Sequence, residues 1–366
     1  PSLEFLPLTY ALFRLGAVPV LIDPGMGGKK LLHCIQQVQP EAFIGIPLAH
    51  AIRTVFRKYF RSISIFVTIG ARWFWGGYEL DDIRKYDDSA VPNATTGPED
   101  LAAVIFTTGS TGPPKGVEYT HGMFEAQAAA LKDAFDLDND DVDMPGFALF
   151  ALFTLALGMT VVIPDMDPTR PANVDPVKIM EAIANNGATF SFGSPALWNR
   201  VSLHCEEHKL SLPCLRNVIM AGAPIPGYLH RRMLNGILPE GAEIHTPYGA
   251  TECLPVTSFE GSNILSETLE LTAQGKGYCV GKPLKQIAIK IIRISDEPVS
   301  RWADVEELPP GEIGEIVIQG PVVSRRYHQL PEQTALHKIY ETDDLERGPF
   351  WHRIGDTGYF DSEGRL

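Results

Sequence analysis

The strongest constraint on the fold is an alternation of helix-type and strand-type segments along the N-terminal part of the chain. Apolar residues recur at helical spacing over Leu3–Leu15, Lys29–Val38 and Leu48–Tyr59, the last of which is also basic. Short strand-type runs lie at Val18–Ile22, Phe43–Ile46 and Ser64–Ile69. Such alternation predicts βαβ units and therefore an α/β fold with a mostly parallel, helix-covered sheet.

The pattern changes along the rest of the chain. Residues 76–100 are polar and rich in turn formers, which predicts a surface connection, and the apolar run Leu101–Phe106 predicts a buried strand followed, after a loop, by a helix over Gly122–Ala134. From about Gly277 apolar and polar residues alternate as in β-strands, and glycines interrupt the alternation. The remaining predicted strands are Thr189–Phe192, Asn217–Met220, Glu243–His245, Ile287–Ile294 and Glu315–Gln319.

Charge and composition exclude several classes of protein. The 366 residues carry 31 Lys and Arg against 45 Asp and Glu, a formal charge of −14, which argues against a nucleic-acid partner. No apolar run reaches the roughly 18 residues of a transmembrane span. The five cysteines include no C-x-x-C pair, so neither a zinc site nor a disulfide framework is indicated. We therefore expect a cytoplasmic protein.

The segment between Thr107 and Gly116 combines glycines, hydroxyls and one lysine directly after the predicted buried strand. Glycine lets backbone N–H groups turn toward an anion, hydroxyls donate to phosphate oxygens and a lysine supplies charge, so a phosphate-binding loop is predicted. It is not a Walker A loop, because Pro114 and Gly116 flank Lys115. The alternative is a polar turn that joins two strands. The loop reads Thr107, Thr108, Gly109, Ser110, Thr111, Gly112, Pro113, Pro114, Lys115, Gly116.

This loop resembles the phosphate-binding signature of the adenylate-forming superfamily of acyl-CoA synthetases, peptide-synthetase adenylation domains and luciferases. Three further motifs follow in that superfamily's order: 248–252 (YGATE), 314–320 (GEIVIQG) and 351–356 (WHRIGD). The resemblance covers essentially the whole chain and implies a large adenylation domain, with helix-covered sheets and a distorted β-rich subdomain. Two departures are Ser324–Tyr327, where a Gly-Tyr pair is usual, and Ile354, where Thr is common.

The resemblance also implies a role for each motif. Thr107 to Lys115 would hold the β and γ phosphates of ATP, whose product is AMP, and Tyr248, with Gly249 beside it, would stack on adenine next to the turn of Gly222, Ala223 and Pro224. Thr251 would contact the α-phosphate and Asp356 the ribose hydroxyls. Glu252 would bind Mg2+, which usually takes only one or two protein carboxylates. The implied catalytic residues are Thr251, Glu252 and Lys115.

The acyl group is expected to be apolar. Residues 145–164 contain no carboxylate, whereas domains that activate amino acids hold the substrate ammonium with an Asp near here. We expect Phe147, Phe150 and Phe153 to face the substrate, with Gly193 on the opposite wall. The alternative is that these residues are ordinary core.

A narrower resemblance is to the bacterial β-lactone synthetases of long-chain olefin biosynthesis, through 18–25 (VPVLIDPG), 41–49 (EAFIGIPLA) and 246–256 (TPYGATECLPV). It implies adenylation of a long-chain β-hydroxy acid, displacement of AMP by the substrate's own hydroxyl, and partners among enzymes of the same lipid pathway. Two alternatives stay open: a fatty-acyl-CoA synthetase that uses CoA thiol, and a nucleotide-binding but catalytically incomplete fragment.

The ends of the chain carry a further expectation. The chain starts at Pro1 and stops at Leu366, ten residues after Asp356, where the superfamily continues through a hinge to a small C-terminal domain with a catalytic lysine. We expect 1–276 to form the α/β nucleotide- and acyl-binding subdomains, incomplete at the N-terminus. Residues 277–366 would form the β-rich subdomain, ending before the hinge. On this expectation the small domain is absent, and the chain binds nucleotide but turns over slowly.

Overall fold

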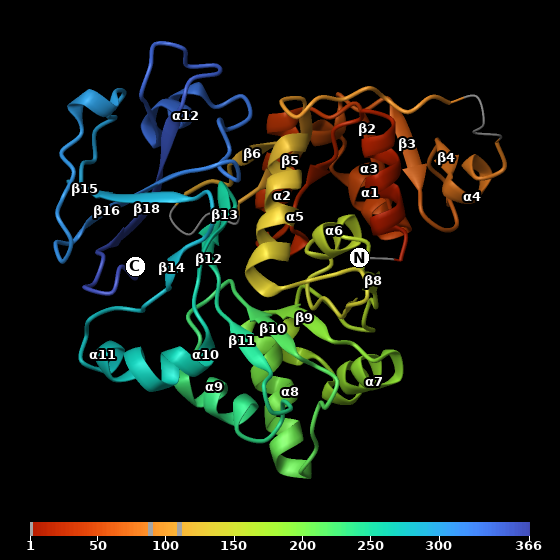
Figure 1. Ribbon diagram of the computed structural model, residues 1–366. Coiled ribbons are helices and arrows are strands. Elements are labelled where there is room, and N and C mark those ends of the chain that lie inside the picture. The colour runs from red at the N-terminus through yellow and green to blue at the C-terminus, as the bar shows by residue number, and fades with distance from the viewer. Residues whose placement is uncertain (1–2, 87–90, 108–111) are drawn as a thin grey trace. The chain divides into compact units, whose positions relative to one another are not determined.

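The computed structural model describes residues 3–86, 91–107 and 112–366, which divide into two compact units (Figure 1). The N-terminal unit runs to His121 and includes Arg326–Pro331. The C-terminal unit consists of Gly122–Arg325 and Glu332–Leu366.

The N-terminal unit contains two three-stranded sheets. The order β2-β3-β4 is parallel throughout, and in β1-β5-β6 the pair β1·β5 is parallel and β5·β6 antiparallel. Its elements are α1 (Phe5–Arg14), β1 (Val20–Leu21), η1 (Pro24–Met26), α2 (Gly28–Val38), β2 (Ala42–Gly45), α3 (Pro47–Val55), η2 (Arg57–Phe60), β3 (Ile65–Thr68), β4 (Tyr78–Glu79), α4 (Leu80–Ile83), β5 (Leu101–Phe106) and β6 (Gly116–Thr120).

Two predictions for this unit need correction. The helix predicted over Leu48–Tyr59 is an α-helix only to Val55, because Phe56 leaves the helical region at φ −101° and ψ 37° and the chain continues as the 3-10 helix η2. The surface connection predicted over 76–100 contains the short elements β4 and α4. The two-residue strand β4 is defined by its pairing with β3. The local sequence pattern does not reveal such pairing.

The C-terminal unit is built on a five-stranded sheet of order β11-β10-β9-β7-β8, parallel at every pair (Figure 1). This confirms the predicted parallel, helix-covered sheet. Its elements are α5 (His121–Phe135), β7 (Val142–Asp143), α6 (Ala151–Ala156), β8 (Thr160–Val161), η3 (Pro171–Asn173), α7 (Pro176–Asn186), β9 (Phe190–Gly193), α8 (Pro195–His208), β10 (Asn217–Met220), α9 (Gly227–Leu234) and β11 (Glu243–His245).

Alternate residues of β10, which lies between β11 and β9, face the opposite layers that cover this sheet. Val218 and Met220 belong to a core cluster with side chains of α7, α8 and α9. Ile219 belongs to a second cluster with α5, α6 and Phe190 of β9. The period of two along β10 therefore explains why helices cover both faces.

The remainder of the C-terminal unit is β-rich. A four-stranded antiparallel sheet has the order β15-β16-β18-β17, and a smaller one has the order β12-β13-β14. The elements are β12 (Tyr248–Ala250), β13 (Cys253–Ser258), α10 (Gly261–Asn263), the π-helix η4 (Ile264–Thr268), α11 (Leu269–Ala273), β14 (Lys282–Pro283), β15 (Ala288–Ile292), η5 (Trp302–Asp304), β16 (Gly314–Gln319), α12 (Pro331–His337), β17 (Lys338–Tyr340) and β18 (Phe350–Gly358).

Candidate nucleotide and acyl site

The carboxyl edge of the five-stranded sheet gathers three of the predicted segments. In register, Met220 of β10 pairs with Gly193 of β9, and Ile219 pairs with His245 of β11. Because the strands are parallel, Gly193, the turn after Met220 and the segment that leads to Tyr248 leave the sheet at one edge. In open α/β sheets this edge is where ligands bind.

Tyr248 and Asp356, predicted separately as adenine and ribose residues, contact each other in the structure. The Tyr248 hydroxyl donates to Asp356 Oδ2 at 2.7 Å, which joins β12 to β18. Burial raises the pKa of Tyr248, and the Asp356 carboxylate raises it further. Tyr248 is therefore a neutral donor, and its ring and the Asp356 carboxylate are held as one unit.

Thr251 and Glu252 form the two-residue turn of a tight hairpin, between the paired residues Ala250 and Cys253. Gly249 is required here, because a Cβ at that position would lie 2.5 Å from the Cys253 carbonyl oxygen. Ser324 N–H donates to the Glu252 carbonyl at 2.8 Å. The turn is thus fixed from both sides, with the Thr251 and Glu252 side chains half-buried.

Ser324 is itself held by a buried lysine. The Lys338 ammonium, 1% exposed, donates to the Ser324 carbonyl at 2.5 Å and lies 3.0 Å from His352 Nδ1. Sequence reasoning missed Lys338. Its position at the start of a short strand gives no local signal of burial.

The turn of Gly222, Ala223 and Pro224 follows β10 directly. All three residues are exposed, and Gly222 has φ +91°, a conformation that favours glycine. The turn therefore presents main chain to solvent at the carboxyl edge of the sheet.

The predicted phosphate loop lies in the N-terminal unit and joins the antiparallel strands β5 and β6. Thr107 N–H donates to the Lys115 carbonyl at 3.0 Å, and Lys115 N–H donates to Thr107 Oγ1 at 3.3 Å. These bonds close the base of the loop. Gly112 is exposed, and Thr108, Gly109, Ser110 and Thr111 lie outside the described residues. The loop leads into a strand, which agrees with the rejection of a Walker A motif.

The Lys115 ammonium lies 4.9 Å from the centroid of the Tyr327 ring. Tyr327 is 2% exposed and forms an isolated bridge with Val117 of β6, and His328 N–H donates to the Gly116 carbonyl at 2.7 Å. The segment that departs from the usual Gly-Tyr pair thus keeps its tyrosine packed against the strand that follows the loop.

The predicted acyl wall is divided between core and surface. Phe150 is 7% exposed and its ring stacks on Phe192 at 4.3 Å and 9°, and Phe153 is also buried. Phe147 is 40% exposed. At Gly193 a Cβ would lie 2.6 Å from Trp198 Nε1. Phe150, Phe153 and Gly193 are therefore closely packed, and Phe147 is the most exposed ring of this set.

The burial of Asp143, at the end of β7, was not predicted from the sequence. The expectation about carboxylates covered only residues 145–164, which begin two residues later. Asp143 is fully buried, and burial raises its pKa to about 7. Thr154 Oγ1 donates to Asp143 Oδ2 at 2.7 Å, whereas Oδ1 has no hydrogen-bond partner among the described residues. One sequence feature could have indicated this burial: Asp143 stands between the apolar residues Val142 and Met144, at the start of the apolar stretch.

The part of the chain that the structure describes gives two findings on metals and membranes. Within that part of the chain, His, Cys, Asp and Glu form no group of three or more that could hold a metal ion. Residues 3–86, 91–107 and 112–366 also contain no helix with the length and apolarity of a membrane span.

Comparison with known proteins finds relatives among olefin beta-lactone synthetases and a similar fold in a fatty-acid-CoA ligase. The chain is 46% identical over 367 residues to an olefin beta-lactone synthetase of Stenotrophomonas maltophilia and 45% identical over 369 residues to one of Xanthomonas campestris. All of this chain is covered, and it spans 65% of the length of each relative. A long-chain-fatty-acid-CoA ligase (FadD1) from Archaeoglobus fulgidus has the same fold, with TM-score 0.79, 24% identity, and coverage of 100% of this chain and 69% of that one.

The family assignment rests on the length of the match. The model of the family described as "AMP-binding enzyme" matches residues 1–328, which include the predicted phosphate loop, the hairpin turn and the predicted acyl wall. The chain therefore belongs to the AMP-binding enzyme family.

Proposed function

We propose that the protein activates a long-chain β-hydroxy fatty acid as an acyl-adenylate and converts it to a β-lactone. The main support is the sequence identity of 46% and 45% to two olefin beta-lactone synthetases, which extends over the whole chain. In the first step a carboxylate oxygen bonds to the α-phosphorus of ATP and pyrophosphate leaves. In the second, the β-hydroxyl oxygen bonds to the acyl carbonyl carbon, the hydroxyl proton is lost and AMP leaves. No external thiol is needed.

For the nucleotide, we propose that Tyr248 stacks on adenine beside Gly222, Ala223 and Pro224, and that Asp356 accepts from the ribose hydroxyls. The Tyr248–Asp356 hydrogen bond supports this, because it fixes the ring and the carboxylate together. A tyrosine ring is a low-entropy platform for a base. The loop from Thr107 to Lys115 would take the β and γ phosphates through its N–H groups, hydroxyls and ammonium.

For the metal, we propose that Glu252 holds Mg2+. The fit is supported by the turn, which presents a single half-buried carboxylate whose main chain is fixed by Ser324. Mg2+ typically takes one or two protein carboxylates and fills its other positions with water and substrate phosphates. When bound, it would neutralise phosphate charge. Thr251, in the same turn, would donate to the α-phosphate.

For the acyl chain, we propose an apolar path along Phe147, with Phe150, Phe153 and Gly193 shaping its wall. The support is the partial exposure of Phe147 next to the fixed Phe150–Phe192 stack. Asp143, buried behind the same segment and bonded to Thr154, keeps its carboxyl out of solvent. We also propose a cytoplasmic location, supported by five free cysteines, and partners among enzymes of the same lipid pathway.

The products distinguish this function from that of an acyl-CoA synthetase. The protein that carries this chain would receive ATP, Mg2+ and a racemic long-chain 3-hydroxy acid, with and without CoA, and products would be identified by mass spectrometry. We expect β-lactone and AMP in equal amounts without CoA. A thioester that forms from ordinary fatty acids, and only when CoA is present, would overturn the proposal in favour of the ligase.

A further inference from the structure

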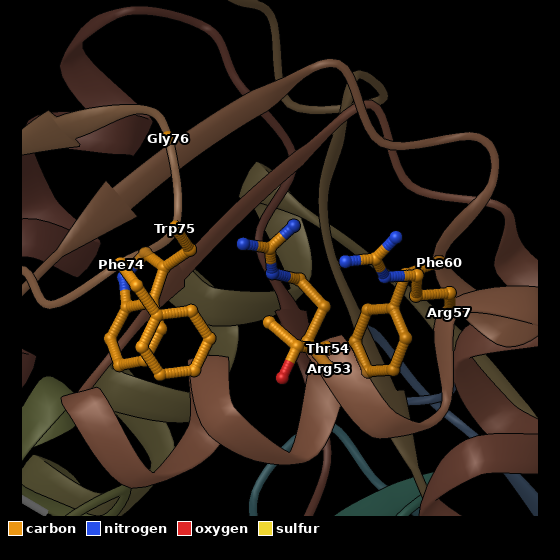
Figure 2. A pocket seen from close by; sticks show the side chains of 7 residues that line it. All are labelled: Arg53, Thr54, Arg57, Phe60, Phe74, Trp75 and Gly76. Carbon is orange, nitrogen blue, oxygen red and sulfur yellow. The ribbon is translucent and has the colours of Figure 1, made fainter.

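A pocket of the N-terminal unit brings together two arginines and three aromatic rings. It has a volume of about 300 Å³ and lies between the end of α3 with η2 and the chain that follows β3. Figure 2 shows the guanidinium groups of Arg53 and Arg57 extended to the same side of the helix. Part of the pocket wall is the basic helix predicted from the sequence. None of the roles proposed above involves this pocket. The other lining residues are Thr54, Phe60, Phe74, Trp75 and Gly76.

The charged groups of this pocket are cations. Its lining residues include two arginines and no Asp or Glu. Arg53 Nε is buried and has no hydrogen-bond partner among the described residues. The Thr54 hydroxyl already donates to the Ala51 carbonyl at 2.7 Å. A ligand that satisfies this lining must therefore supply acceptors and negative charge.

The pocket is held in shape without a ligand. The Arg53 guanidinium lies 3.8 Å from the centroid of the Phe66 ring. Trp75 Nε1 donates to Thr68 Oγ1 at 3.0 Å, and its ring stacks on His50 at 5.5 Å and 14°. Because these contacts fix the walls in advance, little ordering cost would oppose binding.

Electrostatics favours a doubly charged ligand over a singly charged one. Burial lowers the pKa of Arg53, and the positive charge of Arg57 lowers it further. Two like charges in one pocket repel each other, and an anion between them removes that repulsion. A phosphate dianion offers three terminal oxygens to two guanidinium forks, whereas a carboxylate offers two oxygens and one charge.

We propose that this pocket binds a small molecule that carries a phosphate group, with the phosphate on Arg53 and Arg57 and the organic part against Phe74. Phe74 is 78% exposed at the rim, so its ring face is accessible. A volume of about 300 Å³ is at the small end of ligand pockets. Two sources share this chemistry, a soluble phosphomonoester and a lipid phosphate headgroup. The proposal does not rest on the proposed function.

The test is calorimetric titration of the chain with phenyl phosphate, with benzoate as the carboxylate comparison. We expect saturable binding of phenyl phosphate that is weakened at least about tenfold by the double change Arg53→Gln and Arg57→Gln. The matched control is Lys58→Gln with Arg61→Gln, which removes two exposed positive charges from the same segment but none from the pocket lining. It should change the affinity by less than about twofold. Lys115→Ala should leave this binding unchanged.

Absence of saturable phenyl phosphate binding, equal loss in both double variants, or equal affinity for benzoate would overturn the proposal. If the Arg53 change disturbs packing on Phe66, Arg57→Gln alone tests the same point, because Arg57 is exposed. Sedimentation with vesicles that contain phosphatidic acid separates the sources. Capture that is lost only in the Arg53/Arg57 variant would assign the lipid headgroup, and its absence together with phenyl phosphate binding would assign a soluble ligand.

Discussion

Asp143 is the residue whose environment differs most from what its sequence position indicates. Its carboxyl group is fully buried beside Thr154, and burial raises its pKa from the ordinary 3.8 to about 7. The folded protein therefore keeps a proton on Asp143 that the unfolded chain releases near pH 4. Stability contributed by this proton is complete below that pH and is lost as the pH rises toward 7.

Asp143→Asn removes this titration, since an amide still accepts from Thr154 but does not ionise. Between pH 5 and pH 8 the wild type should lose more free energy of unfolding than the variant, by up to about 3 kcal/mol, because only the two pH units between 5 and the folded pKa of about 7 contribute. Urea denaturation of both proteins at the two pH values measures the difference. Asp140→Asn, an exposed carboxyl nearby, is the control and should follow the wild type. Parallel pH dependence of Asp143→Asn and wild type would show the assignment to be wrong.

Tyr248 separates two contributions to nucleotide binding. Tyr248→Phe keeps the ring but removes the 2.7 Å hydrogen bond to Asp356, so AMP affinity should fall by about fivefold, or roughly 1 kcal/mol. Tyr248→Ala also removes the stacking surface and should cost a further 1 to 3 kcal/mol, roughly. Calorimetry with AMP measures both. Unchanged affinity in the alanine variant would exclude Tyr248 from the adenine site.

The individual site residues were predictable from sequence to different degrees. Tyr248, Thr251 and Asp356 stand in ordered motifs, and their roles remain proposals supported by the contacts found here. Asp143 and Lys338 were not predictable, because each is a charged residue whose burial depends on packing from distant segments. Their partners, Thr154 and Ser324, lie 11 and 14 residues away.

At the scale of elements, the hairpin β12–β13 depends on one glycine. In Gly249→Ala the new methyl group would lie 2.5 Å from the Cys253 carbonyl oxygen and 3.1 Å from Leu254 Cα, so the strands must separate. We expect a loss of roughly 1 to 3 kcal/mol of stability and weaker ATP·Mg2+ binding, because the turn with Thr251 and Glu252 is displaced. Thermal unfolding and calorimetry measure the two effects. Gly236→Ala, where no atom lies within 4 Å of the new carbon, is the control, and an equal response of both variants would contradict this account.

The segment around α6 offers a matched pair of phenylalanines. Phe150→Ala removes a ring that is 7% exposed and stacked on Phe192, and should cost roughly 3 to 5 kcal/mol. Phe147→Ala removes a ring that is 40% exposed, and should cost less than about 1.5 kcal/mol while weakening binding of a long acyl chain. Chemical denaturation and fatty-acid binding distinguish them. If Phe147→Ala destabilises as much as Phe150→Ala, both rings are core.

Elements with strong local patterns were predicted well. The strands β5, β10 and β11 have the bounds that the sequence predicted. Short elements were missed where pairing rather than pattern defines them, as at Tyr78 and Glu79, which pair with β3. The end of α3 was missed because the backbone angles of Phe56, not its hydrophobicity, stop the helix.

At the scale of the molecule, a chain of charge −14 is proposed to bind a polyanionic nucleotide. An excess of acidic residues is unfavourable for a nucleic-acid partner. It does not oppose ATP, because positive potential can be local: the loop that ends at Lys115 carries N–H donors and an ammonium. The parallel sheet was predictable because alternation of helices and strands permits few arrangements. The place of residues 326–331 in the N-terminal unit was not predictable, because it reflects their contacts with β6, far away in sequence.

The central claim is that this chain contains a site for an acyl-adenylate. The most direct measurement is calorimetric titration with a hydrolysis-resistant acyl-sulfamoyl adenosine that carries a long 3-hydroxyacyl chain. We predict saturable one-to-one binding that is weakened about tenfold or more by Tyr248→Ala or Asp356→Ala, and unchanged by the double change at Arg53 and Arg57. Absence of saturable binding, or unchanged affinity in the Tyr248 and Asp356 variants, would contradict the account.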